Sequence, residues 1–324
     1  MIGAGPTGVE FASELRDFVE QDGPKYYPEL LQYVRIKIIE ASPTVLAPFD
    51  KSLQEEAISQ LTKSASTKKI EDLKLLPEPH KLTELLLGKG VSEMKEDVIC
   101  LNDGSEIPYG LAVWAAGNGP LPITLQAIEN LKKEQGQGIE QAKAQEIARG
   151  RVAVDPWLRA IGGKGIVFAL GDCSCNTNNQ LPATAQVASQ QGEYLARLLS
   201  QNYDMNSIIN INGGNSILHP PKMDPNREKT LAEKISSYAT QVDDIAAPFQ
   251  FLNLGILAYT GGGSALAQFQ VTPSEKGRVK GKGKIGFGLW RSVYLSKQIS
   301  WRNRVLVFVD WTKTKVFGRD ITRL

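Results

Sequence analysis

The sequence predicts an α/β fold in which helices pack on buried parallel strands, and three observations support this prediction. A glycine-rich turn opens the 324-residue chain and is followed directly by a helix-like segment. A β-branched run comes next and ends in an acidic residue. Later apolar runs end in small or acidic residues, as buried parallel strands do. Together these features predict a Rossmann-like, dinucleotide-binding unit.

The opening turn has the spacing Gly3-x-Gly5-x-x-Gly8. In a dinucleotide-binding turn the first glycine permits the tight bend, the second admits the pyrophosphate, and the third lets the helix pack on the strand. Residues 7–20 repeat apolar side chains at helical intervals, so we expect a helix whose first N–H groups face the phosphates. The next strand should end at Glu40, whose carboxylate would bind the adenosine ribose and repel a 2′-phosphate. This residue favours NADH over NADPH.

Shorter elements fill the rest of the first third of the chain. Residues 21–33 are interpreted as an inserted loop or short helix, and they lengthen the interval between the turn and Glu40 beyond the usual ~20 residues. Residues 44–64 predict a loop and then an amphipathic helix. Asn-Asp-Gly at 102–104 predicts a hairpin turn. The apolar run that ends at Gly117 predicts a buried strand, with Trp114 in the core.

The middle of the chain predicts a second ligand-binding edge. Residues 118–150 look like a connector with a charged helix, and a further buried-strand run ends in Gly171 and Asp172. An aspartate at the carboxyl end of a parallel strand lies where such sheets bind ligands. Residues 202–247 are polar and rich in Asn and Pro, and are interpreted as an insertion or linker.

Residues 181–200 predict a helix with Pro182 just inside its start. On that helix Gln186 and Gln190 are four residues apart and share one face. Glutamines on one face are usually solvated. Here small residues surround them, and these would permit the close approach of something flat.

The C-terminal part of the sequence is basic and aromatic. Residues 249–270 predict a strand, a turn of three glycines and a second strand. From residue 281 to the end, ten Lys or Arg face two Asp, a local charge of +8. Trp and Tyr beside cations suit a helix in a membrane interface. We expect lipid phosphates to meet the following cations: Arg291, Lys297, Arg302 and Arg304.

Composition sets outer limits on the class of protein. The chain is 42% hydrophobic and 22% charged with a net charge of +2, which is ordinary for a globular protein and indicates no particular partner. Three cysteines without a C-x-x-C pair form no secreted disulfide framework, and favour a reducing compartment. The sequence shows no targeting peptide, no apolar run of membrane-spanning length and no nucleic-acid motif, so nucleic acid is not expected as a partner.

Seven blocks in order resemble the type II, non-proton-pumping NADH:quinone oxidoreductases. The similarity runs from Gly3 to Asp320 and thins out at 65–97, 125–150 and 202–247. Its C-terminal part is similar to the eukaryotic, mitochondrial branch. The blocks are GAGPTGVEFASEL, IIEASPTVLAPFD, AVWAAGNGP, VFALGDCS, LPATAQVASQQGEYLA, FLNLGILAYTGGG and WRSVYLSKQISWRNR with FGRD.

The resemblance implies a nested, Rossmann-like FAD/NAD(P)-binding flavoprotein fold with a C-terminal membrane-anchoring segment. The family's FAD-binding glycine turn would precede this sequence, so we expect an N-terminally truncated chain that lacks most of the first NADH-domain strand and is inactive alone. The implied domains are an NADH-binding domain (1–117), the C-terminal part of the FAD-binding domain with the quinone-site helix (118–201), an insertion or linker (202–247), and a hairpin with amphipathic membrane-anchoring helices (248–324).

The resemblance also implies roles for individual residues. NADH would pass a hydride to FAD, which would then reduce a ubiquinone-like quinone with two electrons. No metal is implied. The implied cofactor-binding residues are Gly3, Gly5 and Gly8 for the NADH pyrophosphate, Glu40 for its ribose, Ala116 and Gly117 for the nucleotide cleft, Gly171 and Asp172 for the FAD ribityl or phosphate region, and Ala185 beside the quinone. The implied catalytic residues are Glu10, near the nicotinamide, and Gln186 and Gln190, in an A-Q-x-A-x-Q-Q quinone-site motif.

The implied setting is peripheral contact with the mitochondrial inner membrane, and the oligomeric state, with a homodimer as one option, stays open. Two alternative functions also remain open at this point. A different pyridine-nucleotide flavoprotein reductase is one, although the missing C-x-x-C argues against the disulfide reductases. A nucleotide-binding, membrane-peripheral protein without catalysis is the other.

Overall fold

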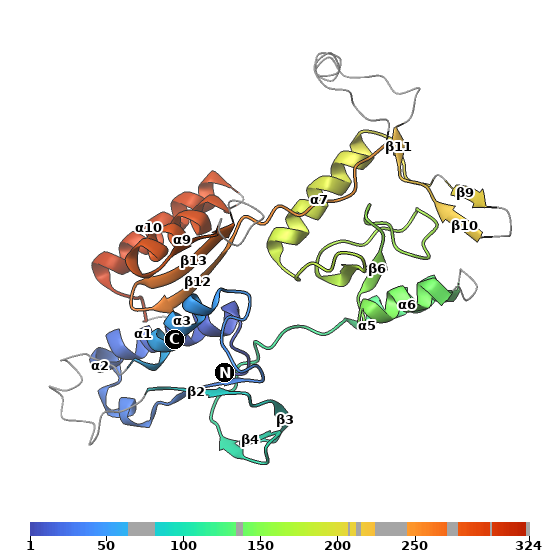
Figure 1. Ribbon diagram of the computed structural model, residues 1–324. Coiled ribbons are helices and arrows are strands. Elements are labelled where there is room, and N and C mark those ends of the chain that lie inside the picture. The colour runs from blue at the N-terminus through green and yellow to red at the C-terminus, as the bar shows by residue number, and fades with distance from the viewer. Residues whose placement is uncertain are drawn as a thin grey trace. The chain divides into compact units, whose positions relative to one another are not determined.

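The computed structural model describes residues 1–63, 82–133, 139–206, 208–211, 215–223, 245–270, 278–298 and 300–321. The chain divides into two compact units, and we describe each by itself (Figure 1). The first unit joins both ends of the chain, Met1–Gly117 and Asn253–Leu324. The second unit is Asn118–Leu252.

The first unit begins with the predicted nucleotide-binding elements. Helix α1 (Pro6–Gln21) follows the glycine turn, and strand β1 (Ile36–Glu40) pairs in parallel with β2 (Thr83–Leu87). The predicted first helix and second strand are therefore both confirmed. The predicted inserted segment contains α2 (Gly23–Tyr26) and a 3₁₀ helix, η1 (Pro28–Tyr33).

The first three residues complete the parallel pairing on both sides of the turn. Toward β1, the Gly3 N–H donates to Ile39 O at 2.8 Å, and the Ile39 N–H donates to Met1 O at 2.8 Å. On the other side, the Ile2 N–H donates to Val113 O at 2.9 Å, and the Ala115 N–H donates to Ile2 O at 2.7 Å. Met1–Gly3 therefore pair with backbone on both sides, although most of a strand was predicted to be missing here.

The remaining elements before Gly117 agree only in part with the sequence. The amphipathic helix is α3 (Lys51–Thr62), and the Asn-Asp-Gly turn joins antiparallel β4 (Val98–Leu101) and β5 (Glu106–Pro108), next to β3 (Val91–Met94). The run that ends at Gly117 is not a buried strand. It makes an isolated bridge to Ile2, and Trp114 is 58% exposed, because the described residues of the unit leave its outer side uncovered.

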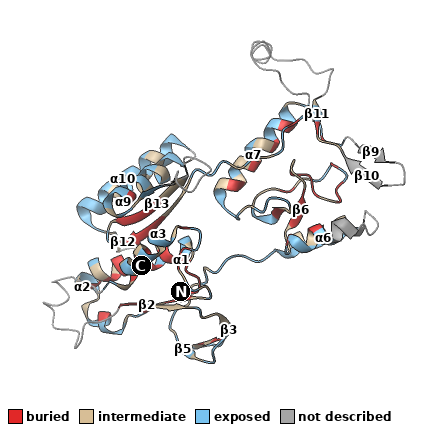
Figure 2. Ribbon diagram, in the orientation of Figure 1, coloured by how far each residue is buried: buried red, intermediate tan, exposed pale blue. Residues whose placement is uncertain are grey.

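The C-terminal part of the first unit is a small antiparallel sheet with helix α9 (Gly283–Ser296) packed on it and helix α10 (Trp301–Phe317) packed on α9. Strands β12 (Ile256–Gly261) and β13 (Ser264–Gln270) form the predicted hairpin, and β14 (Arg278–Gly281) adds an edge. Buried Ala258 and Leu266 of the hairpin share one apolar core with α1 and β1, which unites the two ends of the chain (Figure 2).

The second unit packs its helices around a short parallel pair. Its helices are α5 (Pro122–Lys133), α6 (Ile139–Ile147), η2 (Gly171–Cys173) and α7 (Ala185–Ser200). The strands among its described residues are β6 (Val152–Val154), parallel to β7 (Ser174–Asn176), then β8 (Tyr203–Asp204), β9 (Ile208–Ile211), β10 (Asn215–Leu218) and β11 (Lys222–Met223). The buried core includes Leu158, Leu195 and Leu198. Most of the predicted insertion, 224–244, lies outside the described residues.

Two local predictions in this unit are wrong. The apolar run before Gly171 is not a buried strand: it makes only an isolated bridge, between Arg159 and Phe168, and Ile166 is 67% exposed. Pro182 lies before its helix and not inside it. The helix begins after Thr184, whose side-chain oxygen accepts the Val187 N–H at 3.3 Å, as an N-cap residue does.

Candidate functional site

The glycine turn forms a cradle that other residues could not form. Gly3 has φ +100°, and a Cβ there would lie 2.7 Å from the backbone carbon of Ala115. A Cβ on Gly8 would clash with the carbonyl oxygen of Gly3, so this glycine lets α1 pack on the first strand. A Cβ on Gly5, in contrast, would have no other atom within 4 Å. Gly5 is also the N-cap residue of α1, and no side chain caps the first N–H groups of that helix. These N–H groups therefore lie beside the open space at Gly5 and can bind an anion.

Glu40 lies at this cradle, at the end of β1. Its carboxylate accepts the Ala4 N–H at 2.7 Å on one oxygen and the Ser42 N–H at 2.8 Å on the other. These bonds hold the acid beside the turn and leave lone pairs for a further donor such as a ribose hydroxyl. Ala116 and Gly117 are nearby, since a Cβ on Gly3 would lie 2.8 Å from Ala116 Cα. The structure therefore brings together the predicted glycines, Glu40 and the 116–117 segment.

Glu10 has partners that the sequence did not predict. Its Oε1 accepts two hydrogen bonds, each 3.1 Å long, from the Tyr259 backbone N–H and from the Trp290 indole N–H. Burial raises the pKa of the Glu10 carboxyl, and the two N–H donors oppose that rise. The carboxylate thus faces strand β12 of the C-terminal sheet and helix α9.

Other acids on the same helix also bind the C-terminal segment. Buried Asp17 accepts the Tyr259 hydroxyl, and its two oxygens accept the Gly262 N–H at 2.9 and 3.0 Å. Burial and the adjacent Asp17 carboxylate raise the pKa of Tyr259, which keeps its phenol protonated as the donor. Arg319, which follows α10, pairs with Glu14 at 3.0 Å. We call Glu10, Glu14 and Asp17 the acidic face of α1.

In the second unit, the structure places the predicted glutamines on α7 with different roles. The Gln190 side chain exchanges two 2.9 Å hydrogen bonds with the backbone of Leu252, so its amide is occupied by the chain itself. Gln186 is partly buried near the start of α7, while Asp172 and Ala185 are exposed. Sequence analysis overlooked Gln191. It lies on the apolar stripe of α7, and a glutamine at such a position was the sequence signal that could have indicated a buried polar contact.

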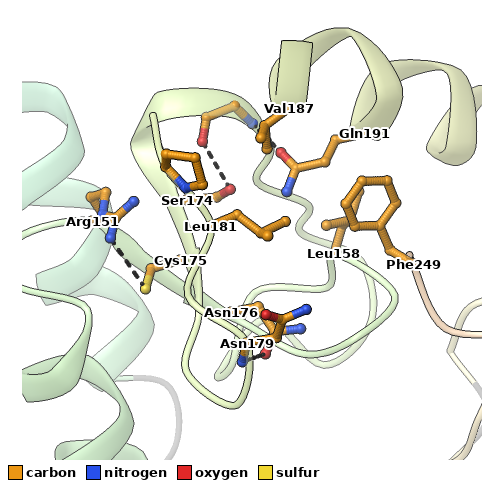
Figure 3. Close-up of a pocket in the computed structure, with 12 residues that line it drawn as sticks. Arg151, Leu158, Ser174, Cys175, Asn176, Asn179, Leu181, Val187, Gln191 and Phe249 are labelled. Atoms are coloured by element: carbon orange, nitrogen blue, oxygen red, sulfur yellow. Dashed lines mark hydrogen bonds between the residues drawn. The ribbon is translucent and has the colours of Figure 1, made fainter. Parts of the chain in front are cut away.

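Gln191 belongs to a small pocket next to η2 (Figure 3). Its side-chain oxygen accepts the Gly171 N–H at 2.6 Å, where Gly171 has φ +70°. Ser174 donates to Gly171 O at 3.1 Å, so both sides of this turn are held. The pocket is lined by Arg151, Leu158, Gly171, Ser174, Cys175, Asn176, Asn179, Leu181, Pro182, Val187, Gln191 and Phe249.

The α9–α10 hairpin exposes large apolar side chains. Figure 2 shows α10 mostly in the colour of exposed residues. Two of the cations predicted to face lipid have partners within the chain. Arg291 stacks 4.6 Å from the Phe287 ring centroid and 4.8 Å from that of Trp311, and Arg304 donates to Ser296 O at 3.1 Å. Lys297 and Arg302 are exposed. The exposed large apolar side chains of α10 are Trp301, Val305, Leu306, Phe308, Val309, Val316 and Phe317. We call the four that share one face of the helix, Trp301, Val305, Phe308 and Val316, the α10 stripe.

In the described part of the chain, no helix has the length and apolar character needed to cross a membrane. The His, Cys, Asp and Glu side chains of that part form no group of three or more that could hold a metal ion.

Two family models match the chain. The pyridine nucleotide-disulphide oxidoreductase model matches residues 1–192, more than half of the chain, and the NDH2 C-terminal domain model matches residues 253–320. The second match coincides with the segment that docks on the acidic face of α1.

Curated relatives and a solved structure agree with these models. The chain is 34% identical to an internal alternative NAD(P)H-ubiquinone oxidoreductase of Solanum tuberosum mitochondria, over all of this chain and 53% of the relative. It is 36% identical to a probable mitochondrial NADH-ubiquinone oxidoreductase of Schizosaccharomyces pombe, over all of this chain and 53% of that protein. The chain thus spans about half the length of these relatives.

The fold matches NDH2 from Plasmodium falciparum, solved in complex with NADH. The TM-score is 0.68 at 18% identity, over 98% of this chain and 66% of that chain. The glycine cradle, the docked C-terminal segment and these matches lead to one assignment. The chain belongs to the pyridine nucleotide-disulphide oxidoreductase family and, within it, to the type II NADH:quinone oxidoreductases, close to the eukaryotic mitochondrial members.

Proposed function

We propose that this chain binds NADH at the Gly3–Gly8 cradle and serves an FAD-dependent NADH:ubiquinone oxidoreductase reaction. The observation that supports the proposal best is the open space at Gly5 beside the ionisable Glu40. The α1 N-terminus would receive the pyrophosphate, since its first N–H groups have no side-chain cap. Glu40 would accept a hydrogen bond from a ribose hydroxyl of NADH. In NADPH the 2′-phosphate takes the place of that hydroxyl, and the Glu40 carboxylate would repel its negative charge.

The second unit contains residues that fit part of an FAD site. Asp172 is exposed, and its carboxylate has no hydrogen-bond partner in the described part of the chain. Gln191 and Ser174 fix the neighbouring Gly171 turn, so Asp172 is held on a rigid support. Asp172 would accept hydroxyls of the ribityl chain. When bound, FAD supplies hydride acceptance from NADH and electron transfer to quinone.

Quinone contact is proposed for the start of α7. Ala185 is small and exposed, and Gln186 is partly buried. Little side-chain bulk therefore projects from the start of α7, which suits the approach of a flat ring. Gln190 would support the quinone contact indirectly, because its amide is hydrogen-bonded to the backbone of Leu252 and holds that segment in place.

We also propose peripheral attachment to the mitochondrial inner membrane through the α10 stripe. Its apolar side chains face solvent, and exposed Lys297 and Arg302 lie near its beginning. Such an arrangement suits a helix lying in the interface of an anionic bilayer.

NADH binding by the full chain tests the core of the proposal. Gly5→Ala adds one methyl group in open space, so the fold should be retained, while the pyrophosphate loses its approach. We expect at least about tenfold weaker NADH binding by isothermal titration calorimetry, which corresponds to ~1.4 kcal/mol. The matched control is Gly110→Ala, which is equally open but far along the chain from the turn. Wild-type affinity in Gly5→Ala would remove the cradle from the NADH site.

A further inference from the structure

The three carboxylates on the acidic face of α1 are not equivalent. Asp17 is closed off by a hydroxyl and a backbone N–H, and Glu14 is paired with Arg319. Glu10 meets no cation in the part of the chain that the structure describes; it meets only the N–H groups of Tyr259 and Trp290. Asp17 and Glu14 therefore fasten the C-terminal segment, whereas Glu10 is held in place without being neutralised.

The two donors of Glu10 both end on the same oxygen. They bind Oε1, and among the described residues no donor meets Oε2. Oε2 is therefore the oxygen that can still gain or lose a proton. A carboxylate held by one oxygen from two directions also has a fixed rotamer.

The indole of Trp290 is itself held firmly. It stacks on Phe287 with the rings 7° from parallel and 6.1 Å apart, and on Tyr294 at 5.4 Å. The Tyr259 ring lies 5.7 Å away on β12. These rings fix the plane of the indole, so its N–H points to Glu10 without a large entropic cost.

We propose that Trp290 is a positioning residue for Glu10, through which the C-terminal segment orients a carboxylate of the NADH-binding helix and leaves Oε2 for proton exchange. The role of Glu10 and Trp290 in the reaction rests on the proposed function, whereas the geometry of the two side chains does not. It assigns the C-terminal helices a part in the reaction in addition to membrane contact.

The charged and titratable groups around Glu10 allow a signed expectation. Glu14 on α1 acts on Glu10 directly and raises its pKa, while Asp17, Arg291 and Arg319 act on Glu14. Trp290→Phe keeps an aromatic ring but removes the N–H, so the buried carboxylate loses one of its two donors. The pKa of Glu10 should then rise by about one unit, the scale of one hydrogen bond to a charged group.

Carbon-13 NMR of glutamate side chains in the full chain measures this shift. The Glu10 signal is identified as the one missing from Glu10→Gln. We expect the raised pKa in Trp290→Phe and the wild-type pKa in Trp311→Phe, which alters the same aromatic row without touching Glu10. An unchanged pKa in a folded Trp290→Phe would overturn the proposal.

A second measurement covers the case in which Trp290→Phe does not fold. The wild-type tryptophan emission should change as Glu10 titrates, and that step should be missing in Glu10→Gln. Identical emission titrations would overturn the proposal. Neither readout requires NADH or turnover, so a failed NADH-binding test and a failed positioning test are distinguishable.

Discussion

Replacing Asp17 by Asn tests how the C-terminal segment is fastened to helix α1. Asp17 is 1% exposed and accepts the Tyr259 hydroxyl together with the Gly262 N–H. Asparagine keeps the size of the side chain but offers one oxygen and two N–H donors. At least one of these N–H groups would face a donor of the hairpin.

The magnitude follows from the bonds that are lost. Hydrogen bonds to a charged acceptor contribute ~1.5–3 kcal/mol each, neutral ones ~0.5–1.5 kcal/mol, and a buried donor without an acceptor costs ~1–3 kcal/mol. We therefore expect Asp17→Asn to lower the free energy of unfolding of the first unit by about 2–4 kcal/mol. The control, Glu14→Gln, breaks a partly exposed pair with Arg319 and should cost at most ~1 kcal/mol.

Urea unfolding followed by tryptophan emission measures both variants. Limited proteolysis adds a second readout, because a loosened hairpin exposes the chain after residue 253 to cleavage. The expected order is wild type, then Glu14→Gln, then Asp17→Asn. Equal losses of unfolding free energy in the two variants would refute the reasoning. The buried hydrogen bonds of Asp17 would then contribute no more than the partly exposed ion pair of Glu14.

Two further predictions concern the ligand and the membrane. Glu40→Gln should raise the use of NADPH relative to NADH, because the 2′-phosphate no longer meets a carboxylate; competitive titration of the two nucleotides measures the ratio, and an unchanged ratio would contradict the ribose assignment. Phe308→Ser should weaken cosedimentation with anionic vesicles, because Phe308 is 60% exposed on the α10 stripe, whereas Thr312→Ser should not; equal sedimentation of both variants would place any membrane contact elsewhere.

The sequence predicted well the elements whose signals are local. The periodicity of residues 7–20 gave α1, and the β-branched run gave β1 with Glu40 at its end. Because strand ends and helix starts of a parallel unit meet at one edge, the cradle residues could be grouped without a structure. The roles of these residues toward NADH stay predictions.

The contacts that were overlooked join distant parts of the chain. Trp290 lies 280 residues after Glu10, and Tyr259 lies 242 residues after Asp17. No periodicity records such a pairing, and each of these acids alone resembles an ordinary solvated helix residue. The apolar runs before Gly117 and Gly171 failed for a related reason. An apolar run predicts that a segment can be buried, but it does not say whether another part of the chain covers it.

A second glycine spacing shows what makes the first one informative. Gly281-x-Gly283-x-x-Gly286 repeats the pattern between β14 and α9, and a Cβ on Gly286 would clash with the carbonyl oxygen of Ala265, just as one on Gly8 would clash with Gly3.

Here, however, β14 is an antiparallel edge strand in the described sheet. The flanking Lys280 and Lys282 are paired with Asp50 at 2.6 Å and Glu56 at 3.2 Å. The glycine spacing by itself therefore accounts for close packing of a helix on a strand. Both turns have open space beside helix N–H groups without a side-chain cap. Nucleotide binding at Gly3–Gly8 is therefore inferred from the two features that the second turn lacks, a parallel neighbour and an acid at the end of the next strand.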